Sequence, residues 1–339
     1  MHRIGGIFDI LTLPEVLEAA ADNACKSRKD RGEVAAFLQD RDHLLQKLRH
    51  ELLTETFVSS EYRMFTIHEK GKERLVADLP LYPDRILHWA ICLAVEDKLN
   101  VKLIAQTYAS IPGRGFHQAV RQVYRYVRND PKAKYALVMD VRKFYQSINL
   151  DILKKKLEAV IKDRRFLRLM FRLLDEYTYG GLPLGNRYSP MLANLYLSNL
   201  DHLLKETHHV HYYVRFMDDM CVIGYSKPWL RRILGVVQGA LAEDGLTLKG
   251  DYQIFPIDSR GIPFLGYRIY SDHILLKRRN KVKMKRAAGR VLRHCKASGE
   301  LSAHDMGTVA SYRGMLKWCN GRHLDKKIFG PIENYCPRK

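Results

Sequence analysis

The chain has 339 residues, of which 46% are hydrophobic and 28% charged, so it can build a globular core and is not expected to be a membrane protein. At this length we expect two or three lobes around one principal core. Lysine and arginine total 57 against 37 acidic residues, which gives a net charge of +20. That excess attracts polyanions and favours nucleic acid as a partner. The alternative is a soluble enzyme that is merely basic.

The six cysteines form no Cys-x-x-Cys pair and no His/Cys cluster at zinc spacing, so we expect reduced core thiols. The N-terminal sequence has no small-residue cleavage site typical of a secretion signal. No run of about 18 apolar residues is present, so no transmembrane helix is expected. These features together predict a cytoplasmic protein without a membrane partner.

The first predicted elements are helices and one hairpin. Residues 12–54 carry apolar residues at three- and four-residue spacing, which predicts amphipathic helices. Residues 61–80 predict a hairpin that turns at "EKGKE". A helix is expected over 83–100, and another follows the turn "IPGRG". The second of these helices carries three arginines on one face: Arg121, Arg125 and Arg128.

The remaining elements mix strands and helices without βαβ regularity, which predicts an α+β fold. An apolar strand begins at residue 135 and places an aspartate at its end. The further expected elements are a single basic helix over 151–177, a Gly/Pro loop at 178–190, a helix at 191–206, a hairpin at 211–226, a helix at 227–243, a strand around 246–255, a hairpin at 261–279 and a basic helical tail at 280–339.

Three aspartates suggest a metal site. Asp218 and Asp219 interrupt the apolar hairpin "HYYVRFMDDMCVIGYS", and Asp140 ends the strand "ALVMD". Antiparallel neighbours would bring these carboxylates within a few Å, where they repel unless they share divalent cations. Two such ions about 4 Å apart support phosphoryl transfer, so the chain is a candidate polymerase or nuclease. The alternative is an Asp-Asp pair that is solvated in a turn.

The ordered motifs resemble those of the reverse transcriptases. "RFMDDM" resembles their Tyr/Phe-x-Asp-Asp box, and "VMDVRKFYQSI" resembles the aspartate box that precedes it. "GLPLGNRYSPMLANLYLSNLD" resembles the loop-helix box between the two, and "PFLGYRI" resembles the later box that supports the primer. The tail segment "SYRGMLKWCNGRHL" is similar to a thumb helix. The motifs are most similar to those of bacterial enzymes from diversity-generating retroelements and phage-defence systems.

The resemblance implies a right-hand polymerase of the α+β class. Its expected parts are an N-terminal helical extension at 1–55, fingers and palm at 56–270, and a basic helical thumb at 271–339. No nuclease domain, maturase extension or zinc module is expected after residue 271. The primer stays open between DNA, RNA and a protein hydroxyl.

The resemblance also implies an RNA-directed DNA polymerase in the bacterial cytoplasm. It would copy a dedicated structured RNA into cDNA from dNTPs with two Mg²⁺ ions, in an antiphage defence system. An accessory protein or a second copy of the chain is an allowed partner. Two alternatives stay open, namely the enzyme of a diversity-generating retroelement and a non-catalytic RNA-binding scaffold with the polymerase fold.

The resemblance assigns roles around the aspartates. Asp140, Asp218 and Asp219 are expected to hold the catalytic ions, and Val141 to add its backbone carbonyl. Tyr145 is expected to pack under the sugar and to exclude a 2′-hydroxyl by its bulk. The alternative for Tyr145 is an ordinary core tyrosine.

Further residues are expected to contact the incoming nucleotide. Lys72 and Arg74 on the first hairpin are expected to bind its triphosphate, because an arginine fork can donate two bonds to phosphate. Arg85 is a further candidate. Leu184 and Gly185 lie in the loop expected to face the base pair, where the glycine allows close backbone approach. A solvated run of charges is the alternative for the basic residues.

Some positions depart from the family pattern. Leu184 stands where many reverse transcriptases have Gln, which is typical of the diversity-generating group and its relatives. Ser189-Pro190 stands where the mutagenic members usually have Ser-Gln, which favours a defence-type or unclassified relative. Lys249 lies near a lysine position of other polymerases, but its uncertain register leaves it unassigned. The triplet His208, His209 and His211 fits no common metal site and is expected at the surface.

Nucleic acid is expected along the tail. The primer-supporting box contributes Gly266 and Tyr267. Residues 277–296 carry ten basic residues without an acidic one, and like charges at helical spacing repel. Such a helix should be marginal alone, so we expect an anionic partner against it. The residues expected to bind nucleic acid there are Lys281, Lys283, Lys285 and Arg286.

Overall fold

The computed structural model describes residues 3–26, 31–69 and 71–335, which fall into two compact units. The first unit holds the chain up to Pro112, Val141–His209 and Val237–Leu248. The second holds Gly113–Asp140, Val210–Val236 and the chain from Lys249 onward. The boundaries of these units differ from the predicted boundaries at residues 55 and 270. The predicted boundaries separate the extension, the fingers and palm, and the thumb, and this division stays a prediction.

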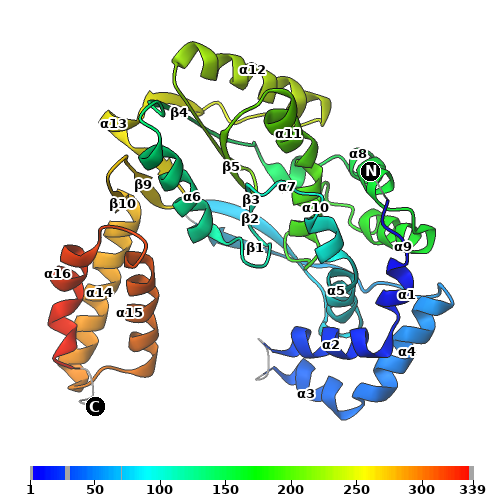
Figure 1. Cartoon of the computed structure of the whole chain (residues 1–339). Helices are drawn as coiled ribbons and strands as arrows, with labels where there is room; N and C mark the ends of the chain where they lie inside the picture. Colours follow the sequence, from blue (N-terminus) through cyan, green and yellow to red (C-terminus); the bar gives the residue numbers. More distant parts are fainter. Residues whose placement is uncertain (1–2, 27–30, 70, 336–339) are drawn as a thin grey trace. The chain divides into compact units, whose positions relative to one another are not determined.

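Helices dominate the first unit (Figure 1). Its helices are α1 (Ile7–Leu11), α2 (Pro14–Cys25), α3 (Gly32–Gln39), α4 (Arg41–Leu53), η1 (Leu81–Arg85), α5 (Ile86–Asn100), α7 (Phe144–Ser147), α8 (Leu150–Val160), α9 (Arg164–Asp175), α10 (Ser189–Tyr196), α11 (Ser198–His202) and η2 (Leu203–Thr207). Its strands are β1 (Arg63–Glu69), β2 (Lys72–Asp78) and β3 (Thr107–Tyr108). The α5 helix is buried over most of its surface, and α1 and α2 pack against it.

The predicted single helix over 151–177 is instead two helices, α8 and α9. The break occurs because Ile161 is extended and forms a parallel bridge with Ile4. Asp163 then caps α9 by accepting a hydrogen bond of 3.2 Å from Phe166 N. The same carboxylate also accepts from the first two amides of α1, those of Ile7 and Phe8. A polar residue inside an apolar helical pattern therefore marks a helix start here.

An antiparallel sheet forms the centre of the second unit. The strands of this unit are β4 (Tyr135–Asp140), β5 (Tyr212–Phe216), β6 (Asp219–Gly224), β7 (Gln253–Pro256), β8 (Ile262–Phe264), β9 (Tyr267–Ile269) and β10 (Ile274–Leu276), of which the last three form a separate sheet. Its helices are α6 (Phe116–Asn129), α13 (Ile257–Arg260), α14 (Arg278–Ser298), α15 (Ala303–Leu316) and α16 (Arg322–Glu333), while α12 (Lys227–Glu243) runs from this unit into the first. Strands β5, β6, β4 and β7 lie next to one another in that order.

The sequence of β6 explains its central position. Met220, Cys221, Val222 and Ile223 are all buried, so the strand carries an unbroken apolar run in place of the alternation of a half-exposed strand. Helix α6 contacts both β5 and β6, and its buried side includes Val120. The predicted strand around 246–255 is shorter than expected. It consists of β7 and an isolated bridge between Leu248 and Val141.

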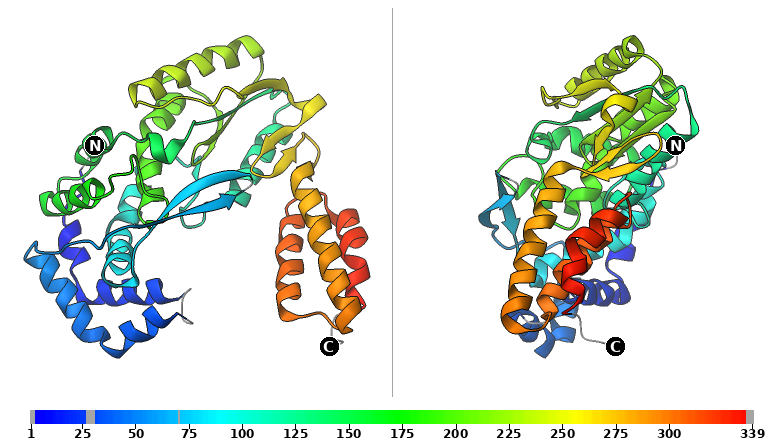
Figure 2. Two further views of the ribbon diagram at one scale, coloured as in Figure 1. Left: turned by 180° about the vertical axis from the view of Figure 1, so that it is seen from behind. Right: turned by 90° about the vertical axis from the view of Figure 1, so that its left-hand side faces the viewer.

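The tail forms a bundle of three helices, α14, α15 and α16 (Figure 2). Met284, Val291 and Cys295 repeat at helical spacing on α14 and pack with Phe329 and Ile332 of α16. This apolar stripe packs α14 into the bundle, so the helix is not free as the sequence argument assumed. The anionic partner against its basic face stays a prediction. The predicted hairpin at 261–279 consists of three strands, β8, β9 and β10. No helix among the described residues has the length and apolar character that crossing a bilayer requires.

Candidate active site

Two neighbouring strands of the second unit bring the aspartates together. Strand β4 pairs with β6 in antiparallel register, and Asp140 at the end of β4 lies opposite Asp219 at the start of β6. Asp218 lies in the turn that precedes Asp219. The carboxylate groups therefore converge at one end of the sheet, which is the arrangement expected from the sequence.

A buried arginine fixes the turn that carries Asp218. Met217 adopts a left-handed conformation with φ of 53°, which is unusual for a residue with a side chain. Arg215 on β5 is fully buried and donates a hydrogen bond of 3.1 Å from Nη1 to the Met217 carbonyl. This bond ties the turn to the strand before it. Arg215 was not predicted as a site residue, because an arginine within an apolar strand gives no sign of its partner.

Asp140 lies close enough to Asp218 to change the ionisation of the Asp218 carboxyl. Burial, and then the hydrogen bond and the negative charge of Asp140, raise the pKa of Asp218 to about 7. Asp219 adds a smaller repulsion in the same direction. In the absence of a cation, one proton is therefore retained near neutral pH by carboxyl groups that would otherwise repel.

Lys249, like Arg215, received no role from the sequence, but the structure places it beside Asp140. Its backbone N–H donates to the Asp140 carbonyl at 2.8 Å, and its ammonium group forms an ion pair with the Asp140 carboxylate. The bridge between Leu248 and Val141 sets this register. The chain leaves β-structure at Gly250 and Asp251 and returns to it in β7, so sequence periodicity alone could not place the lysine.

The donor set fits divalent metal ions that are completed by substrate. Asp140 Oδ2 faces Lys249, whereas Oδ1 is buried without a hydrogen-bond donor among the described residues. Among the residues that the structure describes, no three His, Cys, Asp or Glu side chains form a complete set of metal ligands. Mg²⁺ is usually held by one or two carboxylates together with water and substrate phosphates, so an open set suits it. Asp140 and Asp218 would hold such ions, with Asp219 in register beside them.

The shared proton makes a prediction about stability without metal. The unfolded chain releases the Asp218 proton near pH 4, whereas the folded chain keeps it up to about pH 7. The free energy of unfolding therefore falls as pH rises from about 4 to about 7, and above pH 7 the full destabilisation by the ionised Asp218 carboxylate is present. Asp218→Asn should raise the melting temperature in EDTA at pH 8, with a much smaller effect at pH 4. An equal shift at both pH values would contradict the assigned pKa.

Tyr145 belongs to the first unit and lies on the short helix α7. Its side chain is half-buried, and its ring meets Phe144 edge-on. Its carbonyl accepts a hydrogen bond of 2.8 Å from Leu182 N. Gly181 is required there, because a Cβ at this residue would lie 2.0 Å from the Tyr145 carbonyl oxygen. The loop at 178–190 thus holds the backbone of Tyr145 in place while its ring keeps an accessible side.

That placement makes the sugar-gate role testable. Tyr145→Ala should let the enzyme use ribonucleotides more readily, with a smaller loss of deoxynucleotide use, because removing the ring opens space for a 2′-hydroxyl. Tyr145→Phe is the matched control, since it keeps the bulk of the ring. The measurement is the ratio of kcat/KM for a ribonucleotide to that for the matching deoxynucleotide. An unchanged ratio in Tyr145→Ala would assign Tyr145 to the core.

The loop residues Leu184 and Gly185 contact the hairpin β1–β2. The Leu184 carbonyl accepts a hydrogen bond of 2.8 Å from Ala77 N on β2. A Cβ at Gly185, where φ is +132°, would lie 2.1 Å from the Ala77 carbonyl oxygen. The close approach that the glycine permits is therefore made to this hairpin. Its role toward a nucleotide stays a prediction.

The basic residues of the hairpin lie in different surroundings. Arg74 is exposed on β2 and lies opposite Ile67. Lys72 begins β2, and its side chain lies outside the described residues. Arg85 forms an ion pair with Asp78 and donates to the Leu79 carbonyl at 2.6 Å. Arg85 therefore has a structural task, which leaves Arg74 as the better placed candidate for phosphate.

The primer-supporting box is more structural than expected. Gly266 has φ of +87°, and its carbonyl accepts from Lys277 N and Asn280 Nδ2 at the start of α14. Tyr267 is fully buried, and its hydroxyl donates to the Met315 carbonyl at 3.0 Å. A buried ring cannot contact nucleic acid directly, which corrects the expectation for Tyr267. The pair instead fastens the base of the helical bundle.

The remaining predicted positions lie at the surface, with the exception of Val141. Lys281, Lys283, Lys285 and Arg286 are exposed on α14. Val141 is fully buried beside Asp140 in the chain. The three histidines at 208, 209 and 211 are also exposed, and the described part of the chain has no metal cage there.

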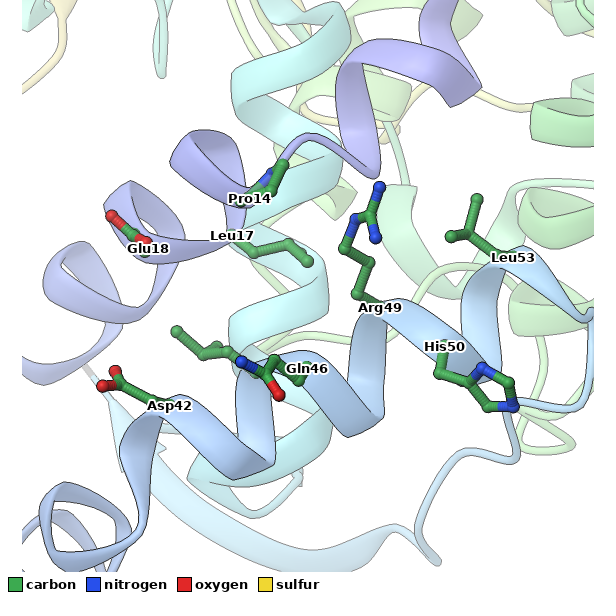
Figure 3. Close-up of a pocket in the computed structure, with 9 residues that line it drawn as sticks. Pro14, Leu17, Glu18, Asp42, Gln46, Arg49, His50 and Leu53 are labelled. Carbon is green, nitrogen blue, oxygen red and sulfur yellow. The ribbon is translucent and has the colours of Figure 1, made fainter.

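A hollow of about 630 Å³ lies between α2 and α4 (Figure 3). Its wall combines acidic Glu18 and Asp42 with basic Arg49 and His50. Arg49 Nε donates a hydrogen bond of 2.9 Å to the Thr12 carbonyl. None of the residues predicted for catalysis lines this hollow, so it is separate from the carboxylate site.

Comparison with known proteins places this geometry in a family. Residues 67–269, more than half of the chain, match the family described as "Reverse transcriptase (RNA-dependent DNA polymerase)". The matched range contains both carboxylate strands, the hairpin β1–β2 and the loop at 178–190.

Individual relatives are distant. Protein YkfC of Escherichia coli (strain K12) is 25% identical over 221 residues, which is 60% of this chain and 58% of that protein. The Group II intron-encoded protein LtrA of Lactococcus lactis subsp. cremoris is 24% identical over 148 residues, 41% of this chain and 24% of that protein. The chain thus spans less than two thirds of either relative.

A solved structure of apo telomerase from Candida Tropicalis, truncated from the C-terminal domain, has a TM-score of 0.49 at 12% identity. It covers 68% of this chain and 59% of that chain, a likeness too weak to bear on activity. The family match confirms the predicted right-hand polymerase fold of mixed α and β structure. The chain belongs to the reverse transcriptase (RNA-dependent DNA polymerase) family.

Proposed function

We propose that the chain synthesises DNA on an RNA template by nucleotidyl transfer at Asp140, Asp218 and Asp219. The observation that carries this proposal is the meeting of Asp140 and Asp218, with Asp219 in register, at one end of a sheet. Family membership supports the same reaction. When bound, two Mg²⁺ ions would activate the attacking hydroxyl and stabilise charge on the leaving oxygen.

The chain's own residues would prepare that site. Asp140 and Asp218 supply carboxylate oxygens, and the Arg215–Met217 hydrogen bond orients the turn between the strands. Lys249 balances the charge of Asp140 before substrate enters. Arg74 would bind the triphosphate, and Tyr145 would limit the sugar to the deoxy form.

The proposed setting is antiphage defence in the bacterial cytoplasm, with a dedicated structured RNA as template. The observation that favours it over diversity generation is Ser189-Pro190, which departs from the Ser-Gln of the mutagenic enzymes. Leu184 is the observation that keeps diversity generation as the second candidate. The name of LtrA, a Group II intron-encoded protein, adds a third setting, an intron, although the chain spans only 24% of that protein.

Two experiments test the proposal. RNA that copurifies with the Asp218→Ala chain from its own host should be one structured species encoded beside the gene. Phage should plate less efficiently on cells with the intact locus than on cells with Asp218→Ala. A neighbouring template repeat and variable repeat would assign diversity generation, and an intron as the bound RNA would assign intron mobility.

The non-catalytic scaffold is the alternative from another class. It predicts that phage protection, if present, survives Asp218→Ala, because protein folding and RNA binding do not need the carboxylate. Primer extension with purified chain separates this alternative directly, since a scaffold incorporates no nucleotide. Retained protection with no synthesis in the wild type would overturn the enzyme proposal.

A further inference from the structure

A hollow of about 370 Å³ lies on helix α9 of the first unit, between α1 and the end of α4. Its size falls within the range of about 300 to 1,000 Å³ typical of ligand pockets. Three arginines on successive turns of α9 line it: Arg165, Arg168 and Arg172. Apolar side chains, including Leu52, Leu169 and Phe171, line the rest. The hollow contains none of the residues assigned to catalysis.

The arginines exceed the acidic groups that face them. Glu55 is the acidic residue in the lining, and Arg168 donates to both its carboxylate oxygens at 3.2 and 2.6 Å. Arg165 lies 3.5 Å from the same carboxylate, and Arg172 donates only to its backbone carbonyl at 3.3 Å. One carboxylate thus serves two guanidinium groups of the lining, while the negative charge that acts on Arg172 is that of Glu176, one helical turn further along and outside the lining. Three arginines therefore face two carboxylates.

Arg172 also carries a buried donor that is not used. Its Nε is buried and has no hydrogen-bond partner among the described residues. Buried donors in native structures are nearly always satisfied, so this group needs an acceptor from elsewhere. The surrounding segment strengthens the attraction for an anion, because residues 150–172 hold eight basic and three acidic residues.

Two of the guanidinium groups lie over aromatic rings. The Arg165 guanidinium lies 4.1 Å from the centre of the Phe8 ring, and that of Arg172 lies 5.9 Å from the Phe57 ring. A ring face within about 6 Å attracts the cation and limits the positions that the guanidinium can take. Phe171 is half-buried at the wall and adds an aromatic surface.

We propose that this hollow binds one nucleotide of a single-stranded RNA, with its phosphate on Arg168 and Arg172 and its base on the apolar wall. The inference rests on the proposed function, in which an RNA partner is present. A concave, apolar floor suits an unstacked base, whereas duplex phosphates would need only a flat basic surface. An acidic peptide would pair with the arginines but would not use the aromatic surface of the wall.

The first test measures affinity with the full-length chain and a fluorescein-labelled 12-nucleotide oligouridylate. Arg168→Ala should weaken binding about tenfold and lower the salt slope by about 0.7, since it removes one charged phosphate contact. Glu55→Gln should tighten binding, because it releases the arginines from their competing carboxylate. A chain damaged by mutation cannot bind more tightly, so this opposite sign excludes misfolding as the cause. Arg232→Ala, which removes another exposed arginine, on α12, is the matched control.

Equal affinities for Arg168→Ala, Glu55→Gln and Arg232→Ala would overturn the proposal. Competitors identify the ligand class. Free uridine monophosphate binding that depends on Arg168, without any such effect on the oligonucleotide, would assign the site to a free nucleotide. An oligoglutamate that displaces the RNA as well as unlabelled RNA does would assign it to an acidic protein. Either result overturns the RNA assignment.

A second test locates the bound base. An oligonucleotide with 4-thiouridine, crosslinked by light to the wild-type chain, should attach to peptides of α1 or α9, and Arg168→Ala should reduce this product. Crosslinks confined to other elements would contradict the site. Asp218→Ala should give the same crosslinks as the wild type. Failure of the polymerase proposal, seen as unchanged synthesis in Asp218→Ala, is therefore distinguishable from failure of this one.

Discussion

Replacing Asp218 by alanine should abolish DNA synthesis while leaving RNA binding largely intact. The carboxylate is one of two that meet between β4 and the turn before β6, and losing it would remove oxygens that are expected to hold the catalytic ions. Metal ions contribute several kcal/mol of transition-state stabilisation, and each 1.36 kcal/mol is tenfold in rate. The expected loss is therefore about a thousandfold or more. Asp140→Ala should behave in the same way.

The measurement is the initial rate of dNTP incorporation on a primed RNA, with RNA affinity measured on the same preparation. Asp258→Ala is the matched control, because Asp258 is an exposed carboxylate of the same unit on α13. It should synthesise DNA at the wild-type rate. Full activity in Asp218→Ala would contradict the two-metal account, whereas loss of RNA affinity together with activity would point to unfolding.

The second large effect concerns the basic face of α14. Replacing Lys281, Lys283, Lys285 and Arg286 together by alanine should flatten the dependence of log affinity on log salt by about 3, since each lost phosphate contact removes about 0.7 to 0.9. All four side chains are exposed, while Met284, Ala288 and Val291 hold the helix in its bundle. The helix should therefore survive the change. Processivity should fall, and single-nucleotide addition at saturating primer should persist.

A control with the same change in charge exists within the bundle. Lys317, Arg322, Lys326 and Lys327 are exposed in and around α15 and α16. Replacing these four by alanine should lower affinity by the general loss of charge, with a smaller change in salt slope. Equal salt slopes for both quadruple variants would show that α14 makes no privileged contact with nucleic acid.

Much of the site was predictable because strand pairing follows simple rules. The apolar strand ending in Asp140 and the apolar hairpin containing Asp218 both need partners in one sheet, and their pairing places the carboxylates at the same end. The hairpin over 61–80 was equally clear, because β-prone arms flank a turn with Gly71. Local pattern and tertiary pairing agree at these places.

Other features depend on contacts that no local pattern encodes. The predicted long helix breaks at Ile161, which pairs with Ile4, and Asp163 then starts α9 while it accepts hydrogen bonds from amides of α1, more than 150 positions earlier in the chain. Lys249 meets Asp140 through a single bridge, whose register periodicity could not supply. Tyr267 was predicted to contact nucleic acid, yet its hydroxyl donates a hydrogen bond to the Met315 carbonyl on α15. Each case is a long-range hydrogen bond that overrides the local reading.

The central claim is that this chain copies RNA into DNA. The most direct measurement supplies the purified full-length chain with a primed RNA of mixed sequence, four dNTPs and Mg²⁺, and sequences the DNA that forms. The account predicts DNA complementary to the supplied RNA, made by the wild type and absent with Asp218→Ala. No DNA from the wild type, or DNA whose sequence ignores the template, would contradict it.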